Sequence, residues 1–270
     1  MNNNYISLDI DLLKNFLNKN LLESNIEIFV SQSTGSTNDD AKNFLSEQSS
    51  LLSIHTSEQQ IAGKGRNGKK WISPKGKNIY LSIGWLSNLK YSQLDGLSLA
   101  IGTILASSLN KFTQNKVGIK WPNDLLIEKK KISGILIETI DINNQVGVVI
   151  GIGINVHMSK EEGKEIDQSW ISLDQVTDSI NNRNEIIGDI VNKMEQQNKY
   201  RDDLKCPCPN KLMVWDNRKS KKSDKSPDFT CSGKTPMECP MHTGKWKKSW
   251  WLDNSDIPEE WNLDGEQTTA

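Results

Sequence analysis

Apolar residues are spaced in two alternating ways over residues 26–156. Between 78 and 85 they occupy every second position, which predicts a strand with one buried face. Between 94 and 112 they recur at intervals of three and four residues, which predicts a helix with one face in the core. The same reasoning predicts a strand at 26–33, a helix capped by Thr37 that runs to Gln48, paired strands at 132–138 and 146–156 around a polar turn at 141–145, and a helix at 184–200.

The composition changes after Tyr200. Residues 201–270 contain a single valine and a single isoleucine, but five of the nine tryptophans and all four cysteines. Such a segment lacks the aliphatic side chains of an ordinary core, so it has to be held by a metal ion, dock on something else or remain partly disordered. We therefore predict a folded domain at 1–200 and a Cys- and Trp-rich tail at 201–270.

Charge and hydropathy narrow the functional class. The chain has 33 basic and 34 acidic residues and a formal net charge of −1, which argues against a strongly basic nucleic-acid-binding protein. The longest nearly apolar run, Val146–Val156, is much shorter than the roughly 20 residues of a membrane helix. The N-terminal residues show no basic region followed by an apolar stretch. The sequence therefore predicts a cytoplasmic protein that does not enter a membrane.

A glycine-rich basic segment, GKGRNGKKW, spans Gly63–Trp71. Closely spaced glycines allow backbone N–H groups to approach an anion, and four Lys and Arg side chains add positive charge. A strand rather than a helix is predicted after it, which argues against a dinucleotide-binding fingerprint, and Lys70 replaces the Ser or Thr of a P-loop. The chain also lacks the HRD and DFG segments of a protein kinase. A solvated basic turn is the alternative to an anion-binding loop.

Two further segments place polar groups or glycines beside strands. In Lys120–Leu125 (KWPNDL) a proline stiffens a turn that aims an Asn and an Asp side chain, which suits a hydrated Mg²⁺ on a polyphosphate. Lys131 precedes a β-rich run and is placed to put a point charge on a carboxylate or phosphate. Surface solvation is the simpler interpretation of any single lysine. Gly151 and Gly153 would let a planar ligand lie against the backbone.

In this order, the segments resemble the successive motifs of the biotin–protein ligases. The resemblance covers about residues 26–200, and the matching segments are Ser36-Thr37-Asn38, Gln60, GKGRNGKKW, Ser73-Pro74 with Gly76 and Asn78, KWPNDLL, KKISGILIE and GIGINV. The related lipoate ligases and octanoyltransferases share a fold but lack the paired GxGRxG and KWPND segments. The resemblance implies an α+β fold with helices packed on a mixed β-sheet. The cysteine-rich C-terminal segment would be a small appendage to that fold.

The resemblance also implies a two-step reaction. Biotin and ATP give biotinyl-5′-AMP and pyrophosphate, and a lysine of a biotin carboxyl carrier protein then accepts the biotinyl group. Lys131 and Arg66 would be catalytic, with Mg²⁺ accompanying ATP. The implied biotin-binding residues are Ser36, Thr37, Asn38, Gln60, Lys64, Gly65, Arg66, Lys131 and Gly134. The implied nucleotide and magnesium residues are Trp71, Lys120, Asn123, Asp124 and Asn155.

Some members of the family carry an N-terminal DNA-binding domain that makes them repressors. About 25 residues precede the first predicted strand, which is too few for that domain, so we expect a ligase without repressor function. The competing interpretation is a catalytically weak ligase-fold protein that acts as a zinc-dependent binding or interaction module. The enzyme is favoured because five candidate residues are all present, namely Arg66, Lys120, Asn123, Asp124 and Lys131.

The tail departs from the family, which usually ends in a small β-barrel-like cap rich in Val and Ile. Grouped cysteines in a cytosolic protein more often bind metal than form disulfides. Candidate zinc ligands, in a module that weakly resembles phage zinc ribbons, are Cys206, Cys208, Cys231, Cys239 and His242. Free thiols in a disordered tail are the alternative. The tail has 12 basic and 12 acidic residues, so we expect docking rather than nucleic-acid binding by its interleaved Lys and Trp residues.

Overall fold

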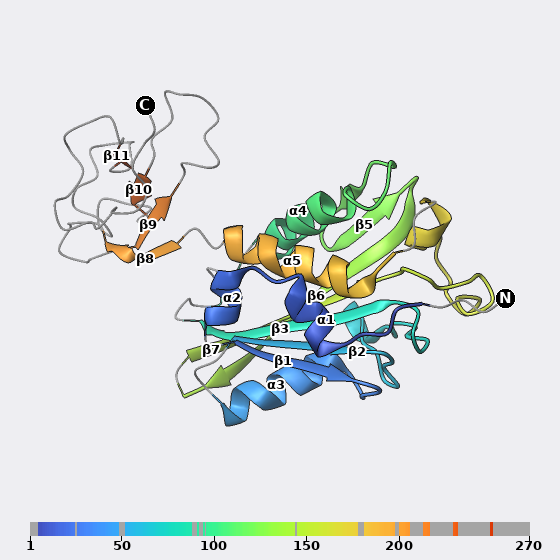
Figure 1. The fold of residues 1–270 in the computed structure, drawn as a ribbon, viewed down its shortest axis with the longest axis horizontal. Helices are drawn as coiled ribbons and strands as arrows, with labels where there is room; N and C mark the ends of the chain where they lie inside the picture. Colours follow the sequence, from blue (N-terminus) through green and yellow to red (C-terminus); the bar gives the residue numbers. More distant parts are fainter. Residues whose placement is uncertain are drawn as a thin grey trace. The chain divides into compact units, whose positions relative to one another are not determined.

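The computed structural model describes residues 5–24, 26–48, 52–87, 91, 94, 96–143, 145–177, 181–197, 200–205, 213–216, 229–231 and 249–250 (Figure 1). The chain divides into two compact units, Met1–Glu195 and Gln196–Ala270. Among the helices of the described residues, none is both long and apolar enough to span a bilayer. The assignment of residues 1–200 as a catalytic domain and of 201–270 as an appendage remains a prediction.

A seven-stranded mixed sheet forms the centre of the first unit. Its order is β1-β2-β3-β7-β6-β5-β4, with β1 parallel to β2 and the other neighbours antiparallel. The strands are β1 (Ile26–Ser31), β2 (Leu52–Ser57), β3 (Ile79–Ser87), β4 (Gly118–Lys120), β5 (Asp124–Ile127), β6 (Lys130–Ile142) and β7 (Gln145–Ile154). The helices are α1 (Ile10–Asn15), α2 (Lys19–Glu23), α3 (Thr37–Glu47), α4 (Leu97–Leu109) and α5 (Arg183–Gln197). The predicted α+β fold, helices on a mixed sheet, is confirmed.

The predicted strands and helices of this unit are present, with ends that differ by a few residues. The largest difference is in the β6–β7 hairpin, where Ile142 pairs with Gln145 and both strands continue into the predicted turn. Polar side chains are compatible with this extension, because an antiparallel pair can expose one face to water while its ladder satisfies the backbone.

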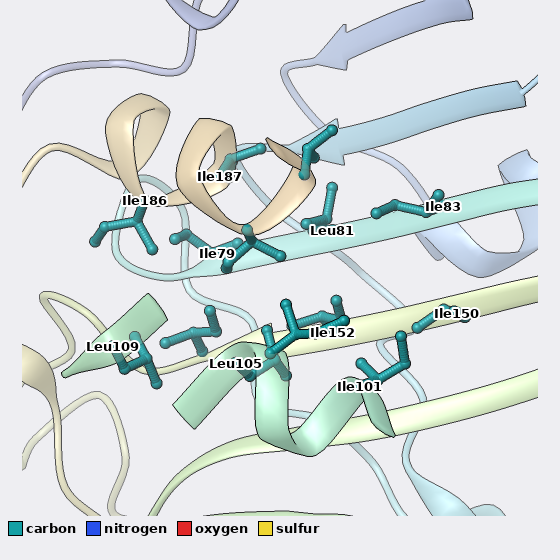
Figure 2. Close-up of a cluster of buried hydrophobic side chains, with 14 of the residues drawn as sticks. Ile79, Leu81, Ile83, Ile101, Leu105, Leu109, Ile150, Ile152, Ile186 and Ile187 are labelled. Atoms are coloured by element: carbon teal, nitrogen blue, oxygen red, sulfur yellow. The ribbon is translucent and has the colours of Figure 1, made fainter. Parts of the chain in front are cut away.

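One face of the sheet carries the main hydrophobic core. The apolar residues of β3 and β7 alternate toward α4 and α5, as Figure 2 shows for Ile79, Leu81, Ile83, Ile150 and Ile152 from the strands, with Ile101, Leu105 and Leu109 from α4 and Ile186 and Ile187 from α5. These side chains are at most 4% exposed. Each buried Leu or Ile contributes about 1.5–3 kcal/mol relative to exposure, so this layer provides a rigid support for the opposite face.

The opposite face is only partly apolar. Ala41 and Leu45 of α3 pack against Ile142 and Val149 of the β6–β7 hairpin. Farther along β3 and β7, the residues that point away from the main core are polar or lack a side chain altogether: Tyr80, Ser82, Gly151 and Gly153. The N-terminus of α3 therefore lies over a polar part of the sheet.

The start of α3 corrects one prediction. Ser36, not Thr37, is the N-cap residue, and its side chain makes no capping hydrogen bond. The backbone N–H of Thr37 donates instead to Oε1 of Gln60 at 2.9 Å. Asp40, in the first turn of α3, accepts a hydrogen bond from the Thr34 hydroxyl at 2.9 Å. The prediction was wrong because partners from outside the helix replace the local cap.

In the second unit the described strands form an antiparallel sheet of order β11-β10-β9-β8. They are β8 (Tyr200–Lys205), β9 (Met213–Asp216), β10 (Phe229–Cys231) and β11 (Ser249–Trp250). Cys231 ends β10, whereas the other candidate zinc ligands, Cys206, Cys208, Cys239 and His242, lie outside the described residues. The zinc site therefore stays a prediction.

Candidate functional site

Two cavities on the α3 side of the sheet share five lining residues: Gly65, Arg66, Trp71, Asn123 and Lys131. The smaller has a volume of about 50 Å³ and the larger about 500 Å³. All nine residues predicted to bind biotin line the smaller cavity, namely Ser36, Thr37, Asn38, Gln60, Lys64, Gly65, Arg66, Lys131 and Gly134. Of the predicted nucleotide and magnesium residues, Trp71, Asn123, Asp124 and Asn155 line the larger cavity.

At α3 the smaller cavity is lined by the side chains of Thr37, Asn38 and Gln60. The fully buried hydroxyl of Ser82, which does not itself line the cavity, links Thr37 to Asn38, and we call these four side chains the polar wall. Thr37 Oγ1 lies 3.1 Å from Gln60 Oε1 and 2.7 Å from the hydroxyl of Ser82. Ser82 Oγ lies 2.6 Å from Asn38 Oδ1. These side chains come from α3, β3 and the segment after β2, and the parallel β1–β2 pair brings the last of these next to α3. The cavity is therefore suited to a small polar group with several hydrogen-bonding atoms.

Gly151 and Gly153 of β7 leave room for side chains of the protein itself. A Cβ at Gly151 would lie 2.2 Å from Oδ1 of Asn38, and one at Gly153 would lie 2.4 Å from the indole of Trp71. The sequence predicted that a planar ligand would lie against these glycines. In the structure, the planar groups at these positions are the Asn38 amide and the Trp71 indole.

Residues 63–71, which we call the flap, form a tight hairpin over the two cavities. The backbone N–H of Gly65 donates to Lys69 O at 2.7 Å, and that of Trp71 donates to Gly63 O at 2.9 Å. The turn between them is a short 3-10 segment, Arg66–Gly68. The basic glycine loop is therefore an ordered structure that closes on itself through backbone bonds.

The charged side chains of Lys64 and Arg66 tie the flap to α3 and to the turn before β5. Lys64 Nζ lies 2.6 Å from Asp39 Oδ2 on α3, and Arg66 Nη1 donates to Asn123 Oδ1 at 3.1 Å. Partial burial opposes the charge on Asp39, but hydrogen bonds from Lys64 and Lys42 outweigh it and hold the pKa of Asp39 below its ordinary value. Asp39 is therefore a carboxylate at neutral pH and holds the ammonium of the flap.

Lys131 lies between the two cavities. Its backbone pairs with the segment before Ile171, through hydrogen bonds to Ser169 O and from Ile171 N–H. Its ammonium lies 2.8 Å from Asp124 Oδ1 and 5.4 Å from the centre of the Trp71 ring. The Lys131 side chain is only 15% exposed. A partly desolvated cation at a fixed position stabilises negative charge more effectively than a solvated surface lysine.

The turn before β5 positions Asn123. Its side-chain Nδ2 donates to Ile135 O at 3.1 Å, and its backbone carbonyl accepts from Ile135 N–H at 2.9 Å. The preceding Trp121–Pro122 peptide bond is cis, and Pro122 O accepts from the Ser98 hydroxyl at 2.8 Å. These bonds hold Asn123 against β6, with its side-chain oxygen toward Arg66.

The larger cavity contains groups of both signs. Lys69 and Lys70 of the flap face a segment that the sequence analysis missed, Glu165–Gln168 with Trp170. That segment is polar and has no regular hydrophobic period, so the sequence carried no signal for it. Within the described residues, no group of three or more His, Cys, Asp or Glu side chains could hold a metal ion by itself.

Two predicted nucleotide residues take positions that the sequence did not specify. Asn155 is 3% exposed, and its Nδ2 donates to Ile171 O at 3.2 Å and to Lys131 O at 3.4 Å, so it also holds the backbone of Lys131 in place. Lys120 ends the exposed edge strand β4 and is not among the described residues that line either cavity.

Tyr80 lines the smaller cavity from β3 and was not among the residues predicted from the sequence. Its phenol donates to Pro74 O at 2.8 Å, and burial raises its pKa, so the group stays neutral. The alternation of β3 held a signal for it, because Tyr80 lies between two core-facing residues and so points to the opposite face.

Fold and site together define an α+β domain with a small polar cavity beside a larger one that is lined by charged side chains of both signs. The chain belongs to the biotin/lipoate A/B protein ligase family, whose family model matches residues 10–155. It is 44% identical over 119 residues to the bifunctional ligase/repressor BirA of Escherichia coli, which covers 44% of this chain and 37% of that protein. It is 33% identical over 170 residues to the biotin–[acetyl-CoA-carboxylase] ligase of Mycobacterium tuberculosis, and this match covers 60% of this chain and 60% of that protein.

The fold is also similar to a solved biotin protein ligase. The structure of the Aquifex aeolicus enzyme in complex with biotin and ATP has a TM-score of 0.53 and 27% sequence identity. That match covers 63% of this chain and 69% of the Aquifex chain. The chain spans between about a third and two thirds of the length of the curated relatives named above.

Proposed function

We propose that the chain is an ATP-dependent biotin–protein ligase that forms biotinyl-5′-AMP and transfers the biotinyl group to a lysine of a biotin carboxyl carrier protein. The observation that carries this proposal is that Arg66 and Lys131, from different segments, line one cavity with the hydroxyl and amide groups of α3. Two cations beside a small polar compartment suit the joining of a carboxylate to a phosphate. We place the reaction in the cytoplasm.

In the first step, a carboxylate oxygen of biotin attacks the α-phosphorus of ATP, and pyrophosphate leaves. Lys131 neutralises charge that develops on the carboxylate and the α-phosphate, and Arg66 holds the phosphate from the flap. In the second step, the carrier amine attacks the acyl carbon and AMP leaves. Neither step requires a covalent bond to the enzyme, so the protein contributes positioning and electrostatic stabilisation.

Asn123 and Asp124 fit a hydrated Mg²⁺ that accompanies the triphosphate. One amide oxygen and one carboxylate meet the usual pattern, in which substrate phosphates and water supply the remaining ligands. Such an ion would neutralise charge on the pyrophosphate that leaves. Trp71, Asn155 and Lys120 remain proposed nucleotide contacts, of which the first two line the larger cavity.

Biotin entry requires the flap to move. Ligand cavities are usually roughly 300 Å³ or larger, whereas the smaller cavity holds about 50 Å³. The contacts that have to open are Lys64–Asp39 and Arg66–Asn123, both of which lie at the exposed rim. We propose that these contacts form again over the adenylate and exclude water from it.

The test is the exchange of labelled pyrophosphate into ATP in the presence of biotin. Lys131→Ala should lower the exchange rate by about 10²-fold, because the fixed cation beside the reacting atoms is lost. The matched control is Lys130→Ala, which removes the exposed neighbouring lysine of the same strand and should leave exchange within about twofold. Unchanged exchange in Lys131→Ala, or exchange that does not depend on biotin in the unmodified protein, would contradict the proposal.

A further inference from the structure

The polar wall of the smaller cavity has too few hydroxyl hydrogens for its hydrogen bonds. It contains three short oxygen–oxygen contacts: Thr37 to Gln60 at 3.1 Å, Thr37 to Ser82 at 2.7 Å, and Ser82 to Asn38 at 2.6 Å. Each contact requires one proton, but only the Thr37 and Ser82 hydroxyls can supply one, because the Gln60 and Asn38 atoms involved are amide oxygens. One of the three contacts therefore has no proton.

Rotating an amide group cannot remove this deficit. Gln60 Oε1 also accepts the backbone N–H of Thr37 at 2.9 Å, and a backbone N–H can only donate. Asn38 Nδ2 lies 2.7 Å from Glu138 Oε2, and an ionised carboxylate can only accept. Both amides are thus held with their oxygens toward the hydroxyl groups. In Asn38, the group that fixes this orientation is the Glu138 carboxylate.

Lys42 keeps Glu138 paired without touching Asn38. Its ammonium lies 2.9 Å from Glu138 Oε1, the carboxylate oxygen that does not bond Asn38, and 3.0 Å from Asp39. Burial opposes the charge on Lys42, but its bonds to Glu138 and Asp39 prevail and raise its pKa. The Lys42 side chain therefore remains a cation beside the Glu138 carboxylate.

We propose that Glu138 is a specificity-determining positioning residue: it holds the Asn38 oxygen toward the hydroxyl of Ser82, leaves the polar wall one proton short, and so favours a head group that presents N–H donors to the Asn38 side chain, which lines the cavity. A cyclic urea, as in biotin, provides two such donors. This inference rests on the proposed function and deepens it. An unpaired buried acceptor costs about 1–3 kcal/mol, so a ligand that supplies the missing proton gains an advantage over an isostere that cannot.

The test compares the dissociation constant of biotin with that of its cyclic carbonate analogue, in which oxygen replaces both ureido N–H groups. Both are measured by calorimetry on the full chain. We expect the unmodified protein to prefer biotin by about tenfold or more. In Glu138→Gln the preference should fall to within about threefold, because the new side chain can donate to Asn38 Oδ1, and the rotated amide then supplies the missing proton to Ser82.

Two variants separate this role from a merely structural one. Lys42→Met removes the other partner of the same carboxylate, so the preference for biotin should remain. Ser82→Ala removes one proton and leaves the Asn38 oxygen without a donor, so the preference should increase. The second variant provides an answer even if Glu138→Gln does not fold.

The outcomes are distinct. A preference that falls in Glu138→Gln, persists in Lys42→Met and rises in Ser82→Ala supports the inference. Equal weakening of both ligands in Glu138→Gln, with an unchanged ratio of their dissociation constants, overturns it. An unmodified protein that binds both ligands equally well also overturns it, but leaves the proposed binding of biotin intact. If the unmodified protein binds neither ligand, the proposed function fails and the inference fails with it.

Discussion

Replacing Arg183 by methionine should expose how strongly the domain depends on one buried ion pair. Arg183 Nη1 lies 2.7 Å from Glu58 Oε2, and Nη2 lies 3.1 Å from Oε1. The two side chains are 1% and 5% exposed. The same guanidinium donates to Ile6 O at 3.2 Å, and Glu58 Oε1 accepts from Leu8 N–H at 2.6 Å. The pair therefore ties the N-terminal segment, the end of β2 and the start of α5 together.

Removing one partner of a buried pair typically costs about 3–5 kcal/mol, because the other charge is left in the interior without compensation. In a domain of this size that loss lowers the melting temperature by roughly 10 °C. Adding Glu58→Gln to Arg183→Met should restore about 1 kcal/mol or more, because it removes the stranded charge.

The assay is urea unfolding followed by circular dichroism. The matched control is Lys164→Met, whose ion pair with Glu161 is 66% and 80% exposed, and which should change the free energy of unfolding by less than about 0.5 kcal/mol. A loss of under about 1 kcal/mol in Arg183→Met, or a double variant less stable than the single one, would refute the reasoning.

Three further outcomes follow from the site and its surroundings. Gly153→Ala should cost about 1–3 kcal/mol in urea unfolding, because the indole above it must move, whereas Gly35→Ala, where the added carbon meets nothing within 4 Å, should be close to neutral. Burial holds the pKa of His55 at about 4, below the ordinary 6.5, so the stability that this residue contributes is complete above about pH 6.5 and is lost as the pH falls through about 4. The loss is up to about 3 kcal/mol, and His55→Phe should flatten that part of the stability profile; an equally steep profile would contradict the assignment. Asp39→Asn should speed biotin dissociation by about twofold to fivefold, as expected for a half-exposed ion pair, and adding Lys64→Gln should have no further effect if the two side chains act together.

Much of the candidate site could be predicted because it lies in short segments of distinctive composition. The basic glycine segment, the Pro-Asn-Asp turn and Lys131 each suggested a cation or an oxygen ligand aimed at an anion, and the structure brings them to adjoining cavities. The period of apolar residues predicted the longer strands and helices of the domain, because the buried face of an element is the property that the pattern records. It did not predict α1, α2, β2, β4 and β5, which are at most six residues long.

Pairings over long distances left no trace in the sequence. Glu58 and Arg183 are 125 positions apart, and Asn38 and Glu138 are 100 apart, so no local spacing reports either contact. The hydroxyl of Ser82 was equally hidden, because a serine on a strand reads as an ordinary polar position until the residue opposite it is known. The chain of protons that defines the polar wall therefore required three-dimensional coordinates.

The two glycines of β7 have a consequence for how such a protein can change over time. Each is matched to one large neighbour, Gly151 to Asn38 and Gly153 to Trp71, and neither strand position tolerates an added carbon while its neighbour remains in place. A substitution at either glycine should therefore be accompanied by a substitution at its large neighbour. A shift in ligand preference that passes through this part of the molecule needs two coordinated changes, which makes it rarer than a shift by any single step.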